Sequence, residues 1–109
     1  MSVLLKVLAQ LFPTAATATK LYTVPASTST VSSSIVICNQ SSTPTTFRVA
    51  IRVSGAADST KDKLYYDLLI NGNDTFIATI GVTLAATDEI WVTATLGTLS
   101  FNLFGQENS

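Results

Sequence analysis

The stretch Thr46-Phe47-Arg48-Val49-Ala50-Ile51-Arg52-Val53 decides the class of fold. Apolar side chains occupy every second position in it, and the positions between them carry a threonine, an alanine and two arginines. Because successive side chains of a strand point to opposite faces, this alternation predicts a strand with one face in a core and the other facing water or a partner. Arg48 and Arg52 share the outward face, where they could pair with carboxylates of a partner protein. A plain solvated face is the alternative.

Short segments of the same kind flank this stretch on both sides, and turn signals separate them. Asn71-Gly72 is a strong hairpin signal, because Asn-Gly readily adopts the positive φ of tight turns. Further strands are expected at residues 21–24, 31–39, 63–70, 76–80, 90–96 and 99–103. About seven or eight short strands without a convincing helix predict an all-β protein, a single antiparallel β-sandwich. Jelly-roll and immunoglobulin-like topologies stay open, although the single Cys38 excludes the immunoglobulin disulfide.

The first twelve residues are unusually apolar and are followed by Pro13 and a run of Thr and Ala. An apolar segment followed by a linker of small residues predicts an arm that docks on the body of its own chain or on a neighbouring subunit. A signal peptide with its charge misplaced at Lys6 is the weaker interpretation. We therefore expect an arm and linker at 1–19, a β-sandwich body at 20–105 and a C-terminal tail at 106–109. The arm residues expected to contact a partner are Val3, Leu4, Leu5, Val7, Leu8, Leu11 and Phe12.

Composition points to a protein that is covered by partners. Only 12% of the 109 residues are charged, about half the usual share, whereas 17 Thr and 12 Ser supply most of the polarity. Solubility of a free monomer depends on surface charge, so we expect burial in a homo-oligomer or against other subunits. The net charge of −1, with no basic stripe, argues against nucleic acid as a partner. No apolar run is long enough for a membrane span, and no membrane partner is expected.

Candidate catalytic groups are few. The chain has no histidine, which removes the usual general base and the commonest metal ligand. Asp88 and Glu89 are neighbours whose side chains would point to opposite faces of a strand. Asp58, Asp62, Asp67 and Asp74 do not fit a compact calcium loop, and the five glycines form no phosphate-binding loop. We therefore expect no enzyme, no cofactor, and no catalytic or metal-binding residue.

Two aromatic residues are candidates for partner contact. Trp91 falls on the face of its expected strand opposite to Ile90 and Val92. Tyr65 and Tyr66 must face opposite sides, and the pattern at 63–70 assigns Tyr65 to the outside. Outward aromatic side chains anchor many interfaces, and they could also form a stacking platform for a sugar. A position in the core is the alternative for both.

Several short motifs occur in an order that resembles a family of small virion proteins of tailed bacteriophages. The resemblance covers roughly Leu21 to Gly105, without any chemical signature. The motifs are Leu21-Tyr22-Thr23-Val24-Pro25, Val36-Ile37-Cys38-Asn39-Gln40-Ser41, Thr46-Phe47-Arg48-Val49, Tyr65-Tyr66-Asp67, Asn73-Asp74-Thr75-Phe76, Leu84-Ala85-Ala86-Thr87-Asp88 and Leu99-Ser100-Phe101-Asn102-Leu103-Phe104-Gly105.

The resemblance implies a structural role in the virion. The leading expectation is a capsid decoration, or cement, protein whose partners are the major capsid protein or other virion subunits. A tail, neck or fibre-associated module is the second expectation. A carbohydrate- or receptor-binding β-sandwich, using Tyr65 or Trp91, is the alternative from a different class.

Overall fold

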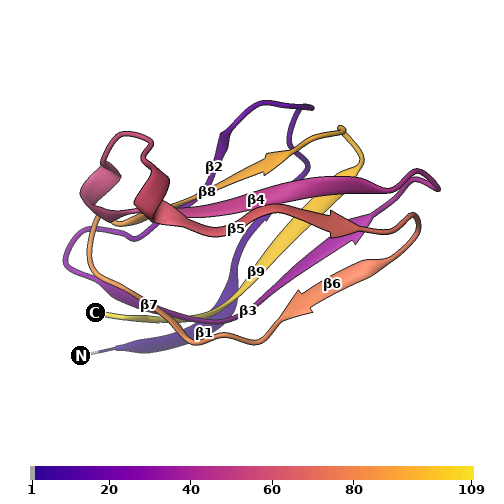
Figure 1. Cartoon of the computed structure of the whole chain (residues 1–109). Coiled ribbons are helices and arrows are strands. Elements are labelled where there is room, and N and C mark those ends of the chain that lie inside the picture. The colour runs from indigo at the N-terminus through magenta and orange to yellow at the C-terminus, as the bar shows by residue number, and fades with distance from the viewer. Residues whose placement is uncertain (1) are drawn as a thin grey trace.

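The computed structural model describes residues 2–109 and contains nine strands and two short 3-10 turns (Figure 1). The turns η1 (Val53–Gly55) and η2 (Thr60–Asp62) both lie between the fourth and fifth strands. The strands are β1 (Val3–Leu11), β2 (Thr19–Thr23), β3 (Ser29–Asn39), β4 (Thr45–Arg52), β5 (Lys63–Ile70), β6 (Thr75–Ala78), β7 (Val82–Leu84), β8 (Glu89–Ala94) and β9 (Leu99–Asn108).

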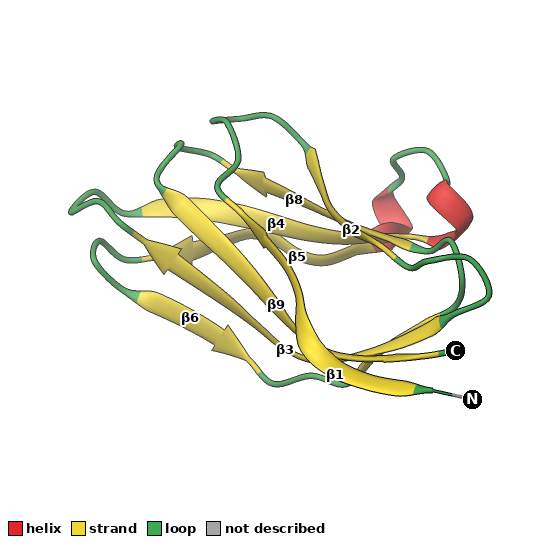
Figure 2. Cartoon of the chain, turned by 180° about the vertical axis from the view of Figure 1, so that it is seen from behind, coloured by secondary structure: helices red, strands yellow, loops and turns green. Residues whose placement is uncertain are grey.

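The strands form two antiparallel sheets that pack face to face (Figure 2), which confirms the predicted β-sandwich. The five-stranded sheet has the order β1-β9-β3-β6, with β7 also paired to β3, and the four-stranded sheet has the order β2-β8-β4-β5. The pairs β4·β5, β3·β6/β7, β2·β8 and β1·β9 are nested about the connection between β4 and β5. This nesting is a long hairpin rolled into two sheets, so the topology is a jelly roll.

The core fills the space between the sheets with the alternate residues of nearly every strand. Phe47 and Phe101 are completely buried, and their ring centroids lie 6.3 Å apart in an edge-to-face arrangement. Phe76 and Tyr65 join the same aromatic cluster. Each buried aromatic or large aliphatic side chain contributes roughly 1.5–3 kcal/mol, so this layer is the main source of stability.

A buried polar residue fastens the loops at one end of the sandwich. The Asn39 side chain donates to the backbone carbonyls of Thr43 and Asn71 at 2.9 and 3.2 Å. Its Oδ1 accepts from the Ser41 amide and the Thr98 hydroxyl at 3.1 and 3.0 Å. Three loops are thereby joined through a side chain that is only 1% exposed.

The N-terminal segment does not form a separate arm. Residues 3–11 pair with β9 along its length, and Ser2 and Ser109 exchange two backbone hydrogen bonds at 2.7 and 2.9 Å. Residues 106–108, expected in a tail, belong to β9 for the same reason, and the two termini lie side by side (Figure 1). The predicted division into arm, body and tail is corrected here, because β9 satisfies its backbone groups on one side with β1.

Two smaller differences concern the strand count. The expected strand at 76–80 ends at Ala78, and the separate strand β7 follows it and also pairs with β3. Val53 continues the apolar alternation of β4 in sequence but lies in η1 and is 64% exposed.

Candidate interaction surfaces

The outer face of the five-stranded sheet carries no charged side chain among the residues that the structure describes. Its inner positions are fixed by the buried residues of β3 and β9, and the positions between them therefore point outward. The only charges in this sheet, Lys6 and Glu107, alternate to the inner side. The outward apolar side chains of this charge-free face are Val3, Leu5, Val7, Val31, Val36, Ile77 and Phe104.

The cross-strand register brings these side chains into contact rows. Val7 on β1 lies opposite Phe104 on β9, and Val36 on β3 lies opposite Ile77 on β6. Leu5 is 74% exposed and Ile77 is 63% exposed. Uncharged polar residues lie among the apolar ones, with Gln106 between Leu5 and Val31 and Asn102 opposite Val36. Several exposed apolar side chains on one uncharged face mark an interaction site more often than a single exposed Leu does.

One edge strand of this sheet is β1. Its single charged side chain, Lys6, is held on the inner side by a small polar network. The Lys6 ammonium lies 2.9 Å from a carboxylate oxygen of Glu107, whose other oxygen accepts from the Tyr22 hydroxyl. Thr30 lies 2.9 Å from the same hydroxyl. The pKa of Tyr22 is raised to about 12, mainly by burial and to a smaller extent by the hydrogen bond to Glu107. The hydrogen bonds from Tyr22 and Lys6 lower the pKa of Glu107.

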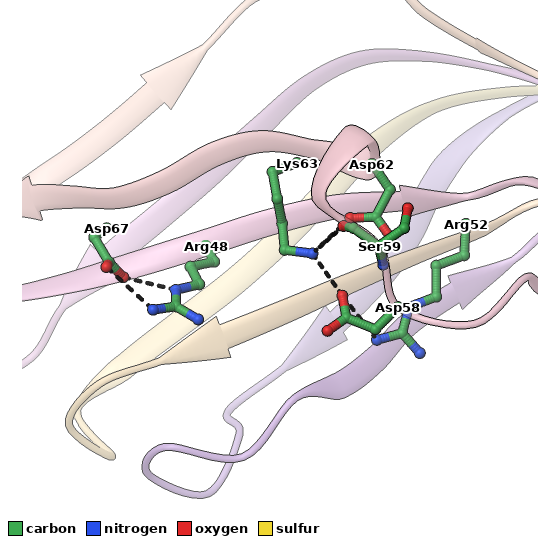
Figure 3. Close-up of polar contacts among 7 residues, drawn as sticks. All are labelled: Arg48, Arg52, Asp58, Ser59, Asp62, Lys63 and Asp67. Carbon is green, nitrogen blue, oxygen red and sulfur yellow. Dashed lines mark hydrogen bonds and ion pairs between the residues drawn. The ribbon is translucent and has the colours of Figure 1, made fainter.

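The outer face of the four-stranded sheet is different, because it holds most of the strand charges. Arg48 Nε and Nη2 donate to the two carboxylate oxygens of Asp67 at 2.7 and 3.1 Å (Figure 3). The same guanidinium lies 4.1 Å above the centre of the Tyr66 ring. The pair lowers the pKa of Asp67 and raises that of Arg48. Arg48 is therefore already paired within its own chain.

Arg52, two positions further on, is held by aromatic packing. Its guanidinium lies 3.9 Å from the centre of the Trp91 ring, and the Trp91 indole N–H donates to Glu89 Oε1 at 2.8 Å. Asp58 is the nearest carboxylate, at 3.9 Å, and Arg52 Nε is buried without a hydrogen-bond partner. One face of the Trp91 ring is thus covered, which leaves less of the indole for stacking on a sugar.

Lys63 completes the ionic cluster beside Arg52. Its ammonium pairs with Asp58 and Asp62, at 2.6 Å for Asp62, and donates to the Ser59 carbonyl at 2.8 Å (Figure 3). The hydrogen bond from Lys63 lowers the pKa of Asp58. Because the two basic side chains, Arg52 and Lys63, are balanced by the two carboxylates of Asp58 and Asp62, the cluster presents little net field to a distant partner.

The structure places the predicted contact residues in different environments. Arg48, Arg52 and Trp91 share the outer face of the four-stranded sheet, in adjacent rows of β4 and β8. Five residues at or beside β1 are exposed, and they are Val3, Leu4, Leu5, Val7 and Phe12. Leu8 and Leu11 instead pack inward against the core.

Tyr65 is the clearest correction. It packs against Phe47 and Phe76, with centroid distances of 6.1 and 5.4 Å, so it is part of the core. The cause is a β-bulge in β5, where Tyr66 and Asp67 together oppose Arg48. The extra residue shifts the side-chain alternation by one position, which turns Tyr65 inward and Tyr66 outward. Tyr66 is 61% exposed.

Sequence reasoning missed four members of the charge-free face, namely Val31, Val36, Ile77 and Phe104. Each alternates with buried residues in its own strand, which is the signal that identifies an outward position. Their gathering on one face depends on β1, β9, β3 and β6 lying side by side, and the order of strands in a sheet is not visible in a single strand's pattern.

Within residues 2–109, no three His, Cys, Asp or Glu side chains gather in a way that could hold a metal ion. The same part of the chain has no helix with the length and apolarity needed to cross a bilayer. Neither a protein-family model nor a curated protein matches the sequence.

Proposed function

We propose that the chain is a non-enzymatic structural protein of a tailed-phage virion, with a capsid decoration protein that stabilises the head shell as the leading form. The observation that carries the proposal is the charge-free outer face of the five-stranded sheet. It exposes several apolar side chains without any charged one, and burial against a shell subunit would remove them from water at roughly 25 cal/mol per Å² of apolar area.

The distribution of charge supports docking by one face. The four-stranded sheet carries Lys20, Arg48, Arg52, Asp67 and Glu89, all with an ionic or hydrogen-bonded partner in the chain. A face of paired charges is suited to water, and an uncharged apolar face is suited to a partner. The jelly roll agrees with this role, since viral capsid proteins use it, but lectins use it as well and a fold alone does not select a function.

The test compares two lysine substitutions at strand residues of nearly equal exposure on opposite faces. Ile77 is 63% exposed on the charge-free face, and Leu69 is 62% exposed on the outer face of the four-stranded sheet. Particles assembled without the chain are mixed with the purified protein, and bound copies are counted after sedimentation.

We expect unchanged binding to heads for Leu69→Lys and a loss of about tenfold or more for Ile77→Lys, because a lysine would be desolvated at the interface. A reconstruction of the decorated particle then gives the position of the chain. Equal binding by the two variants would contradict docking by the charge-free face. Density on the tail, neck or fibre instead of the head would replace the decoration role with the second form of the proposal.

A further inference from the structure

The N-terminal half of β1 has a row of backbone groups that point away from the sheet. Ser2 and Ser109 exchange both of their backbone hydrogen bonds, which fixes the phase of the ladder between β1 and β9. In an antiparallel ladder, hydrogen-bonded pairs alternate with non-bonded pairs. Leu4 and Lys6 therefore bond to β9, and the N–H and C=O groups of Val3, Leu5 and Val7 point to the open edge.

The other three sheet edges carry features that discourage pairing with a further strand. The edge strand β5 has a bulge with Asp67 at a φ of 53°, and β2 has a register shift between Lys20 and Tyr22. The edge strand β6 has only four residues. Bulges, charges and short length are the usual means of blunting a sheet edge.

The segment Val3–Val7 has none of these features. It contains no proline, its register with β9 is regular, and the irregularity of β1 begins only after Val7. Its one charge, Lys6, points inward to Glu107 at 2.9 Å instead of guarding the edge. This edge is therefore open and regular over five residues, four of which are apolar.

We propose that this edge binds the same edge of a second copy, antiparallel, about a twofold axis at Leu5. In that register Leu5 lies opposite Leu5 of the second copy, and Val3 lies opposite Val7 of the second copy. These are the residues whose backbone groups point outward, so the three pairs match in hydrogen-bonding phase. The residue pattern Val-x-Leu-x-Val is the same read in either direction, which is the self-complementarity that an isologous interface needs.

The side chains agree with this register. On the outer face the pairing places only Val and Leu opposite one another, and apolar cross-strand pairs are stabilising. On the inner side Leu4 lies opposite Lys6 of the second copy. The aliphatic part of that lysine can cover Leu4 while the ammonium group stays paired with Glu107 of the lysine's own chain. No like charges are opposed.

The dimer would join the two five-stranded sheets into one continuous sheet. The charge-free faces of both copies would then form a single surface, on the same side of that sheet. This inference concerns the edge of β1 and does not depend on the virion role, because the face used for docking remains free in the dimer.

A charge exchange at Leu5 tests the proposal. Leu5 is 74% exposed, so Leu5→Glu and Leu5→Lys leave the packing of the monomer unchanged. Analytical ultracentrifugation should show the native chain as a dimer, with the dissociation constant of each variant raised about tenfold by the lost Leu pair and the opposed like charges. An equimolar mixture of the two variants should restore dimers, as mixed pairs. Gln10→Glu, on the same strand beyond the irregularity, should behave as the native chain.

Cross-linking fixes the register. In a Cys38→Ser background, Leu5→Cys should form a covalent dimer with a short bis-maleimide, whereas Gln10→Cys should not. The two Gln10 positions would lie about 30 Å apart, at roughly 3.3 Å per residue along the strands. A native chain that is monomeric at high concentration, a mixture that does not restore dimers, or cross-linking through Gln10 would each overturn the proposal. Shell binding by Ile77→Lys is measured in a separate experiment. Each of the two proposals can therefore fail without affecting the test of the other.

Discussion

Asp67 lies in the bulge of β5 directly beside Arg48 of β4, with a left-handed φ of 53° and two hydrogen bonds to the guanidinium. The two facts are connected. The bulge places Tyr66 and Asp67 together opposite Arg48, so that the ring and the carboxylate both reach the same guanidinium. Asp is among the few non-glycine residues that tolerate this backbone conformation.

The effect of substitutions at Asp67 on stability should therefore depend more on the positive φ of this residue than on the loss of its ion pair with Arg48. Arg48 and Asp67 have side chains 38% and 44% exposed, and exposed ion pairs contribute little. We expect Asp67→Asn and Asp67→Gly to keep nearly native thermal stability, because both residues tolerate a positive φ. Asp67→Ala should melt at a clearly lower temperature. Equal melting temperatures for the Asn and Ala variants would show that the backbone conformation is not the deciding term.

Asn39→Ala should destabilise the protein by about 2–4 kcal/mol, because the substitution removes a buried side chain together with its hydrogen bonds to the backbone of several loops. The Asn39 side chain is bonded to Thr43, Asn71, Ser41 and Thr98. Urea unfolding provides the measurement. Gln10→Ala is the matched control, since Gln10 also loses a side-chain hydrogen bond, to Asn102, but at an exposed position. A loss no larger than that of the control would contradict the role of Asn39.

Gly105→Ala should cost about 1–3 kcal/mol or more, because an added Cβ would lie 2.2 Å from the Val31 carbonyl oxygen and 2.9 Å from Ser32 Cα. The contacts are with backbone, which cannot move aside as a side chain could. Gly81→Ala is the control, since a Cβ there meets nothing within 4 Å. That substitution should be neutral or slightly stabilising through the unfolded state. Chemical denaturation of both variants decides the matter, and equal stability would refute the close approach.

Tyr22 should make the stability of the protein depend on pH in the alkaline range. Its pKa is raised from about 10 to about 12, so the unfolded chain loses this proton first as the pH rises. The native state then binds more protons than the unfolded state, and stability is complete below pH 10 and falls between about 10 and 12. Tyr22→Phe should lose about 1–2 kcal/mol at neutral pH.

The same substitution should remove this part of the alkaline decline. Denaturant unfolding of both proteins at about pH 8 and about pH 11 separates Tyr22 from the other tyrosines and the lysines. Parallel loss of stability in the two proteins at the higher pH would mean that the native state does not favour the protonated phenol.

Much of the fold could be predicted from the sequence. The alternation in β4 and the spacing of the other apolar runs predicted a β-sandwich, and Trp91 was correctly placed opposite to Ile90 and Val92. These features are local, since the direction of a side chain along a regular strand follows from its neighbours alone. The expected hairpin at Asn71-Gly72 was wrong, because β5 and β6 lie in different sheets and neither of the two residues has a positive φ.

The bulges were not predictable in this way. The one in β5 turned Tyr65 into the core, and the one after Val7 turned Leu11 inward and Gln10 outward. A bulge depends on the partner strand that it opposes, so the pattern of one strand does not contain it.

The sequence by itself determined that this protein is a charge-poor, all-β chain with an unusually apolar N-terminal segment. Only the tertiary structure decided where the apolar side chains of that segment lie. Pairing of β1 with β9 made the N-terminal segment an edge strand instead of an arm, and brought Val7 and Phe104 together beside Val36 and Ile77. The physical reason is that backbone hydrogen bonding between distant strands sets the order of a sheet, and this order decides which outward residues become one surface.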